Sequence, residues 1–111
     1  MVFVESEWFT RRLLELAGDQ ADDVLRAIQT DLLGSPFRGR LVQGLGGIRK
    51  GRCANPGRGK GKRGGYRYLY LFLARRDRVH LLFLLDKGEQ EDLTSEERVI
   101  LRRLVAEIEK E

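Results

Sequence analysis

The stretch YRYLYLFLARRDRVHLLFLL, residues 66–85, decides the fold of this chain. Its first part, residues 66–74, is aromatic and apolar, which predicts a central strand covered on both faces. Residues 79–85 form a second apolar run, and Arg76 and Asp77 between the two runs suit a tight turn. We therefore expect two neighbouring antiparallel strands at the centre of a sheet.

A glycine-rich segment precedes this hairpin. Residues 39–65 hold ten of the thirteen glycines, and no helix is expected there because each glycine costs a helix about 1 kcal/mol relative to alanine. Within the segment, residues 48–54 predict a strand, residues 55–57 a turn, and residues 58–65 a flexible basic loop.

Helix signals lie on both sides of the sheet-forming part. Ser6 is a suitable N-cap for a first helix, which Gly18 ends. Asp19 is a suitable N-cap for a second helix, so the two helices should form an antiparallel hairpin. Thr94 and Glu97 have the spacing of a capping box at the start of a third helix near the C-terminus.

Together with a short edge strand at residues 2–4, these signals predict the order β-α-α-β-β-β-α. The last three strands should form an antiparallel meander sheet, with the N-terminal helical hairpin and the C-terminal helix packed on one face. The fold class expected is α+β, and a length of 111 residues predicts a single domain over residues 1–111.

The cysteine content and the apolar runs of the sequence argue against a disulfide-bonded, membrane-spanning or zinc-binding protein. The single cysteine, Cys53, excludes an intrachain disulfide, which fits a reducing, cytoplasmic location. The N-terminus lacks the basic region of a signal peptide, and the longest apolar run, residues 81–85, is too short to cross a membrane. One histidine and one cysteine cannot form a usual zinc site, and we expect no metal or other cofactor.

Charge is distributed unevenly along the chain. Residues 32–76 contain twelve Lys and Arg and no Asp or Glu, whereas the rest contains nine basic and seventeen acidic residues. A basic patch of this kind attracts polyanions over a Debye length of about 8 Å, so nucleic acid is the leading candidate partner. The alternative is a solubilising surface without a ligand.

Four cations are candidate site residues. Lys50 and Arg52 alternate along a predicted strand and so project from one face, where two positive charges repel unless an anion lies between them. Arg67 begins the apolar central strand, where a cation needs either a ligand or a partner such as Asp86. Lys87 follows the last strand and either closes the same site or forms a surface ion pair.

The basic loop offers contacts of another kind. Its G-x-G-x-x-G at Gly59, Gly61 and Gly64 precedes a strand rather than a helix, which argues against a dinucleotide site. Cations interleaved with glycines suit contacts to phosphates without sequence readout. We expect contacts of this kind from Arg49, Arg58, Lys60, Lys62 and Arg63.

The remaining candidates are more typical of a core. His80 lies within a strand, where packing is more common than catalysis. Cys53 has no histidine near it in the sequence and is expected to be a buried thiol. The aromatic stripe on alternate residues from Tyr66 to Phe72 is more often core than a platform for stacking bases.

Three segments then suggest a family. They are Gly46-Gly47-Ile48-Arg49-Lys50-Gly51-Arg52, Lys62-Arg63-Gly64-Gly65-Tyr66-Arg67, and Lys87 followed by Glu91-Asp92-Leu93-Thr94. In this order they resemble the HigB-like branch of the RelE toxin family, which has G-[LI]-R-K-x-R, K-R-G-G-x-R and K-x-x-x-[ED]-D-L segments. The resemblance covers residues 41–105.

The resemblance implies a RelE-like fold and a bacterial toxin that cleaves mRNA, often on the ribosome, without a metal. A co-encoded antitoxin, usually a helix-turn-helix DNA-binding protein, neutralises such toxins. The catalytic residues implied by the motifs are Lys50, Arg52, Arg67 and Lys87. Many relatives of the RelE type also have a tyrosine near the C-terminus, whereas this chain has none after Tyr70.

RNA supplies its own nucleophile, the 2′-OH, so the expected chemistry is positioning and proton transfer. Arg52 and Arg67 are expected to clamp the scissile phosphate, Lys50 to act as base and Lys87 to protonate or neutralise the leaving 5′-oxygen. Three alternatives stay open. They are a ParE-like toxin that inhibits DNA gyrase, a non-catalytic protein that binds RNA or ribosomes, and a family member that has lost its activity.

Overall fold

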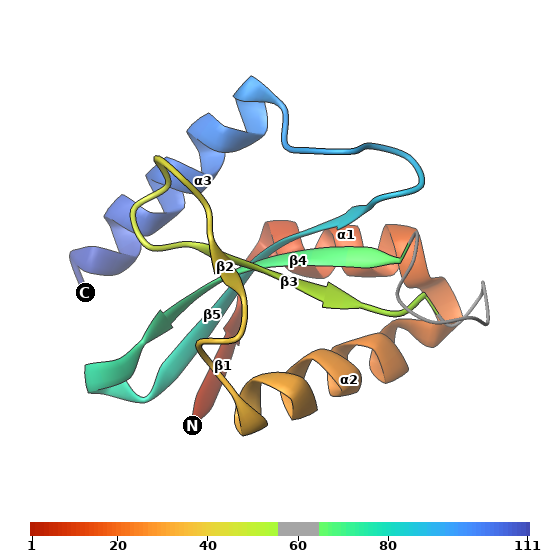
Figure 1. Cartoon of the computed structure of the whole chain (residues 1–111), viewed down its shortest axis with the longest axis horizontal. Helices are drawn as coiled ribbons and strands as arrows, with labels where there is room; N and C mark the ends of the chain where they lie inside the picture. The colour runs from red at the N-terminus through yellow and green to blue at the C-terminus, as the bar shows by residue number, and fades with distance from the viewer. Residues whose placement is uncertain (56–64) are drawn as a thin grey trace.

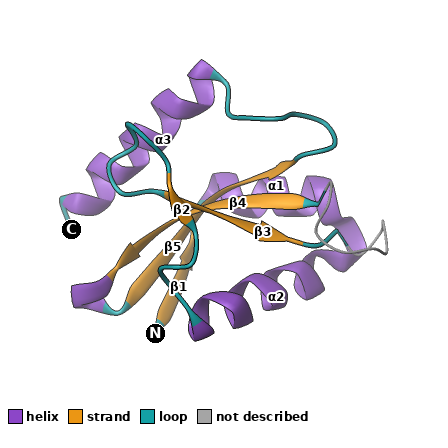
Figure 2. Cartoon of the chain, in the orientation of Figure 1, coloured by secondary structure: helices purple, strands orange, loops and turns teal. Residues whose placement is uncertain are grey.

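The computed structural model describes residues 1–55 and 65–111 (Figure 1). The elements, coloured by type in Figure 2, are β1 (Val2–Glu5), α1 (Glu7–Ala17), α2 (Ala21–Gly34), β2 (Arg40–Leu41), β3 (Arg49–Cys53), β4 (Tyr66–Leu73), β5 (Arg78–Asp86) and α3 (Ser95–Glu109). Short 3-10 turns lie at Gly18–Gln20 and Ala74–Arg76. All seven expected elements are therefore present, and β2 is an addition within the glycine-rich segment.

The sheet has five strands in the order β1-β5-β4-β3-β2. β3, β4 and β5 form the expected antiparallel meander. β1 pairs in parallel with β5, so the sheet is mixed rather than antiparallel throughout. Most of the chain separates these two strands, so no tight turn dictates their relative direction.

The expectation that all helices pack on one face of the sheet is wrong. α1 and α2 cover one face and α3 covers the other (Figure 1). The cause is the sequence of β4 and β5, which is apolar on both faces and therefore needs cover on both. The cluster beneath α1 and α2 includes Phe9, Ile28, Tyr66, Tyr68 and Tyr70. The cluster beneath α3 includes Leu69, Leu71, Phe83, Leu101 and Val105.

Helix ends follow their local signals in two of three cases. The Ser6 hydroxyl accepts a hydrogen bond from the Phe9 amide at 2.9 Å, and Gly18 ends α1 with a φ of +52°. The expected capping box of Thr94 and Glu97 is present at the start of α3. The expectation for Asp19 is wrong, because a 3-10 turn intervenes and leaves α2 without a side-chain cap.

A bulge in β5 decides which way its C-terminal half faces. Leu82 is an extra residue between Leu81 and Phe83, which pair with consecutive residues of β4. Because side chains alternate along a strand, one extra residue reverses the faces of all residues after it. Leu81 thus packs beneath α1 and α2, whereas Leu85 packs on the side of α3.

Candidate active site

A pocket forms at the sheet edge because β2 is short. Only Arg40 and Leu41 pair with β3. Before Arg40 the chain turns away, and Tyr70 holds it there by donating to the Pro36 carbonyl at 2.9 Å and accepting from the Gly39 amide at 3.0 Å. A Cβ at Gly39 would lie 2.8 Å from this hydroxyl, so the turn requires glycine. β2 therefore leaves the edge of β3 beyond Lys50 uncovered.

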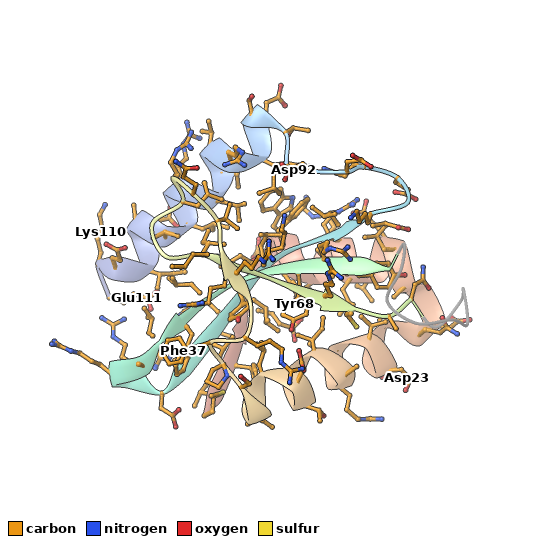
Figure 3. All side chains as sticks on the ribbon, in the orientation of Figure 1. Asp23, Phe37, Tyr68, Asp92, Lys110 and Glu111 are labelled. Atoms are coloured by element: carbon orange, nitrogen blue, oxygen red, sulfur yellow. The ribbon has the colours of Figure 1, made fainter. Side chains whose placement is uncertain are left out.

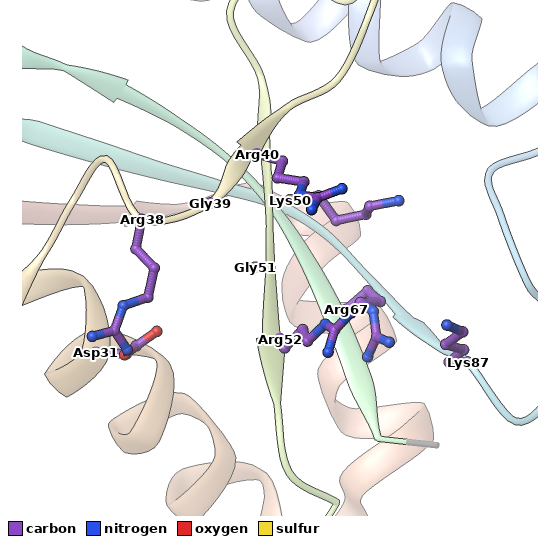
Figure 4. Close-up of a pocket in the computed structure, with 9 residues that line it drawn as sticks. All are labelled: Asp31, Arg38, Gly39, Arg40, Lys50, Gly51, Arg52, Arg67 and Lys87. Atoms are coloured by element: carbon purple, nitrogen blue, oxygen red, sulfur yellow. The ribbon is translucent and has the colours of Figure 1, made fainter. Parts of the chain in front are cut away.

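The pocket, whose lining residues are drawn in Figure 4, has a volume of about 500 Å³. It is lined by Asp31, Arg38, Gly39, Arg40, Lys50, Gly51, Arg52, Arg67 and Lys87. Six of these residues are basic and one is acidic. The structure thus brings the four candidate catalytic residues into one pocket, from β3, β4 and the end of β5.

Arg52 and Arg67 are direct partners across β3 and β4. Such partners have Cβ atoms about 5 Å apart on one face of the sheet. Arg67 is only 7% exposed, and its pKa is lowered by burial and, to a smaller extent, by the charge of Arg52. The alternative ion pair with Asp86 is absent: among the described residues, no carboxylate lies within ion-pair distance of Arg67.

The two lysines reach the pocket by different routes. Lys50 lies two residues before Arg52 on β3 and so shares its face. Lys87 follows β5, and its amide donates to the Gly65 carbonyl at 3.1 Å, which extends the pairing with β4. The bulge at Leu82 places Lys87 on the same face as Arg67. Within residues 1–55 and 65–111, neither lysine has a carboxylate partner, so the alternative surface ion pair of Lys87 is absent.

The single carboxylate of the pocket is already occupied. Asp31 on α2 pairs with Arg38 and also accepts a hydrogen bond from the Tyr68 hydroxyl at 2.9 Å. Burial and this hydrogen bond raise the pKa of Tyr68. Five pocket cations consequently have no carboxylate partner in the described part of the chain. Like charges this close are unfavourable until an anion enters.

Comparisons with known proteins bear on the fold. No family model matches the chain. A mutant of the RelE toxin of E. coli in the free state is 15% identical, with a TM-score of 0.57 over 81% of this chain and 86% of that chain. The RelBE2 toxin–antitoxin complex from Mycobacterium tuberculosis contains a chain that is 23% identical, with a TM-score of 0.59 over 77% of this chain and 95% of that chain.

The chain has the RelE fold. The intact RelBE toxin–antitoxin complex of E. coli provides a further match, 16% identical with a TM-score of 0.55 over 77% of this chain and 94% of that chain. No helix among the described residues could cross a membrane. In the same part of the chain, no group of three or more His, Cys, Asp and Glu side chains could hold a metal ion.

Some expected contact residues lie away from the pocket of this RelE fold. Arg49 points to the other face of β3, where it donates to the carbonyls of Phe37 and Gly39 at 3.1 and 2.7 Å and stacks on the Phe37 ring. It therefore holds the turn before β2. The other four, Arg58, Lys60, Lys62 and Arg63, lie outside the described residues.

The residues expected to be structural are buried. Cys53 is 6% exposed and packs in the core beneath α1 and α2. The tyrosines of β4 belong to the same core, so they do not form a platform for bases. His80 is also buried and does not line the pocket.

Sequence reasoning missed Arg38 and Arg40. Both line the pocket, but Arg40 lies in the glycine-rich segment and Arg38 directly precedes it, where no strand was expected before residue 48. The available signal was the alternation Arg38-Gly39-Arg40, which is typical of cations on one side of an extended segment.

Proposed function

We propose that this chain is a RelE-like toxin, a metal-independent endoribonuclease that cleaves mRNA by attack of the 2′-OH. The observation that carries this proposal is the pocket itself, where five cations from four different strand regions meet without a carboxylate partner among the described residues. Such a site suits a phosphodiester, whose charge grows in the transition state of cleavage. The RelE fold supports the same proposal.

In the proposed mechanism Arg52 and Arg67 hold the two non-bridging oxygens of the scissile phosphate. Arg67 is buried, and its guanidinium donates to the Tyr66 carbonyl at 3.4 Å, so it needs little reorganisation when the substrate binds. Lys50, in its neutral form, removes the proton from the 2′-OH, and the 2′-oxygen bonds to phosphorus. Lys87 donates a proton to the 5′-oxygen as its bond to phosphorus breaks. The products are a 2′,3′-cyclic phosphate and a 5′-hydroxyl.

The proposal extends to partners. A cognate antitoxin of the helix-turn-helix type neutralises the toxin, and similar chains occur in RelBE toxin–antitoxin complexes. Residues 1–111 act as one toxin domain in the cytoplasm, with mRNA on the ribosome as substrate. Arg49, Arg58, Lys60, Lys62 and Arg63 remain candidate contacts to ribosomal RNA.

The decisive experiment induces the chain in a bacterium and maps mRNA 5′ ends. We expect new 5′-hydroxyl ends and growth arrest with the wild type, and neither with Arg67→Ala. The matched control is Arg11→Ala, which removes an exposed arginine of α1 outside the pocket and should keep full activity. Circular dichroism of purified Arg67→Ala tests that it folds. Growth arrest by the wild type without new RNA ends would refute the nuclease proposal.

One observation favours a second candidate, a protein that binds RNA without cutting it. The described lining of the pocket contains no tyrosine or histidine, and its one carboxylate, Asp31, pairs with Arg38, so proton transfer falls to the two lysines. Purified protein mixed with RNA, with and without ribosomes, separates the two candidates. Binding that weakens with salt while the RNA stays intact supports the non-catalytic candidate.

A further inference from the structure

Arg40 is a cation of the pocket that the proposed reaction does not use. It lies on β2, directly opposite Lys50 of β3, so the two side chains share one face of the sheet. Its side chain is exposed and lines the pocket (Figure 4). Within the part of the chain that the structure describes, no carboxylate or carbonyl accepts a hydrogen bond from it.

Arg38 provides an internal comparison. It lies two residues earlier and also lines the pocket, but Asp31 neutralises it, and Tyr68 in turn holds Asp31. The two neighbouring arginines thus differ in their partners. Arg38 forms an ion pair within the chain, whereas the guanidinium of Arg40 has no such partner among the described residues and is available to a ligand.

The backbone that carries Arg40 is fixed on both sides. Before it, the Gly39 amide donates to the Tyr70 hydroxyl. After it, the Val42 amide donates to the Ile48 carbonyl at 2.9 Å, next to the pairs that join β2 to β3. A guanidinium on a fixed strand loses less freedom when it binds a ligand than one on a free loop.

The cations form two rows across the sheet. Arg52 and Arg67 face each other across β3 and β4, and Arg40 and Lys50 face each other across β2 and β3. The rows are two residues apart along β3, a distance of about 7 Å. Two rows of cations at this separation suit two neighbouring anions better than one.

We infer that Arg40 binds the phosphate next to the scissile one in a single-stranded RNA, so that the substrate runs from Arg67 across β3 to the edge strand β2. This inference rests on the proposed function and adds a second phosphate subsite to it. The smallest ligand that fills both subsites has two phosphates. Arg40 acts here in substrate binding and takes no part in proton transfer.

The test measures binding of two short ligands that cannot be cleaved, 2′-O-methylated ApA with one phosphate and 2′-O-methylated ApApA with two. For the wild type we expect the second phosphate to tighten binding about tenfold, the effect of one charge-assisted contact. This exceeds the twofold statistical gain of a ligand with two phosphates. In Arg40→Ala the second phosphate should no longer tighten binding, while the affinity for ApA stays unchanged. Arg40→Lys should retain part of the gain in affinity from the second phosphate. Arg11→Ala, which removes the same charge outside the pocket, should retain all of this gain.

Two results would overturn the inference. One is that the gain in affinity from the second phosphate persists in Arg40→Ala. The other is that Arg40→Ala and Arg11→Ala weaken binding of both ligands to the same extent, which would indicate only a long-range effect of charge. Since neither ligand has a free 2′-OH, the result is independent of cleavage. Arg40-dependent binding in a chain that does not cut RNA would refute only the nuclease proposal. Cleavage without an Arg40-dependent gain would refute only the second subsite.

Discussion

Gly51 lies where the pocket on one face of β3 meets the core on the other face. It lies on β3 between Lys50 and Arg52, and its own face of the strand is filled by the ring of Tyr68. A Cβ at this position would lie 2.3 Å from Cζ of that ring. The close approach of backbone and ring thus sets how deep β3 lies against the core, and with it where the two flanking cations project.

Gly51→Ala should therefore destabilise the chain. The methyl group forces the Tyr68 ring or β3 to move, and overpacking of this kind costs about 1–3 kcal/mol. The matched control is Gly34→Ala at the end of α2, where nothing lies within 4 Å of the added Cβ. Urea denaturation of both variants measures the difference. Equal stabilities would show that the contact between Gly51 and Tyr68 does not restrain β3.

A second residue, His80, makes the stability of the folded chain depend on pH. Burial, and to a smaller extent Arg78 and Arg76, lowers the pKa of His80 below its usual 6.5, although Glu111 acts in the opposite direction. Its Nε2 has no hydrogen-bond partner among the described residues. The folded chain therefore favours the neutral imidazole.

The consequence is a loss of stability on acidification. The unfolded chain takes up a proton below about pH 6.5, whereas the folded chain resists it, so the free energy of unfolding should fall as the pH drops from 7 towards 5.5. His80 is the only histidine, and carboxylates titrate mostly below this range. His80→Gln should remove most of the slope. Thermal melts of both proteins at several pH values test this, and parallel pH profiles would count against it.

At the scale of elements, most local signals were predictive, with the expected cap at Asp19 as the exception, whereas features that depend on tertiary contacts were not predictable. The capping box of α3 and the two central strands were predictable because each depends on residues close together in the sequence. The bulge at Leu82 was not, since it falls in an unbroken apolar run with no change of pattern to mark it. β2 was hidden because a two-residue strand exists only through its partner β3.

The capping box gives a prediction for α3. The Thr94 hydroxyl accepts from the Glu97 amide at 3.1 Å, and the Glu97 carboxylate accepts from the Thr94 amide at 2.9 Å. Thr94→Ala should lower the free energy of unfolding by about 1 kcal/mol. Ser95→Ala, one residue further along, is the control and should have little effect. Thermal denaturation compares the two, and a larger loss in the Ser95 variant would contradict the assignment of the cap.

At the scale of the whole molecule, folding concentrates a charge pattern that was already visible in the sequence. Four pocket cations were predictable from their spacing and from the resemblance they carry. The alternation Arg38-Gly39-Arg40 did not place Arg40 in the pocket, because its position there depends on the hydrogen bond between the Gly39 amide and the Tyr70 hydroxyl, two residues 31 positions apart. The side to which Arg49 points follows from the alternation of side chains along β3, but its stacking on the Phe37 ring could not be predicted from the sequence.

The concentrated charge predicts that the proposed binding of RNA depends strongly on salt. For single strands the logarithm of affinity falls by about 0.7 per phosphate neutralised and per tenfold rise in salt. Arg52→Ala should reduce this slope by about one such increment, because it removes one pocket cation. Fluorescence anisotropy with a 2′-O-methylated RNA at several NaCl concentrations measures the slope. If Arg11→Ala reduces it equally, the slope reflects net charge rather than the pocket.

Because β2 pairs with only part of β3, the protein has a partly uncovered sheet edge, and this matters for how it is handled. Residues 51–53 of β3 have no partner on their outer side among the described strands, so their peptide groups can pair with a strand of another molecule. The lysine and arginines that line the pocket lie beside this edge, and the repulsion between these charges on two copies of the protein opposes such pairing. Variants in which several of these charges are removed at once should therefore self-associate, and single substitutions studied in dilute solution are the safer choice.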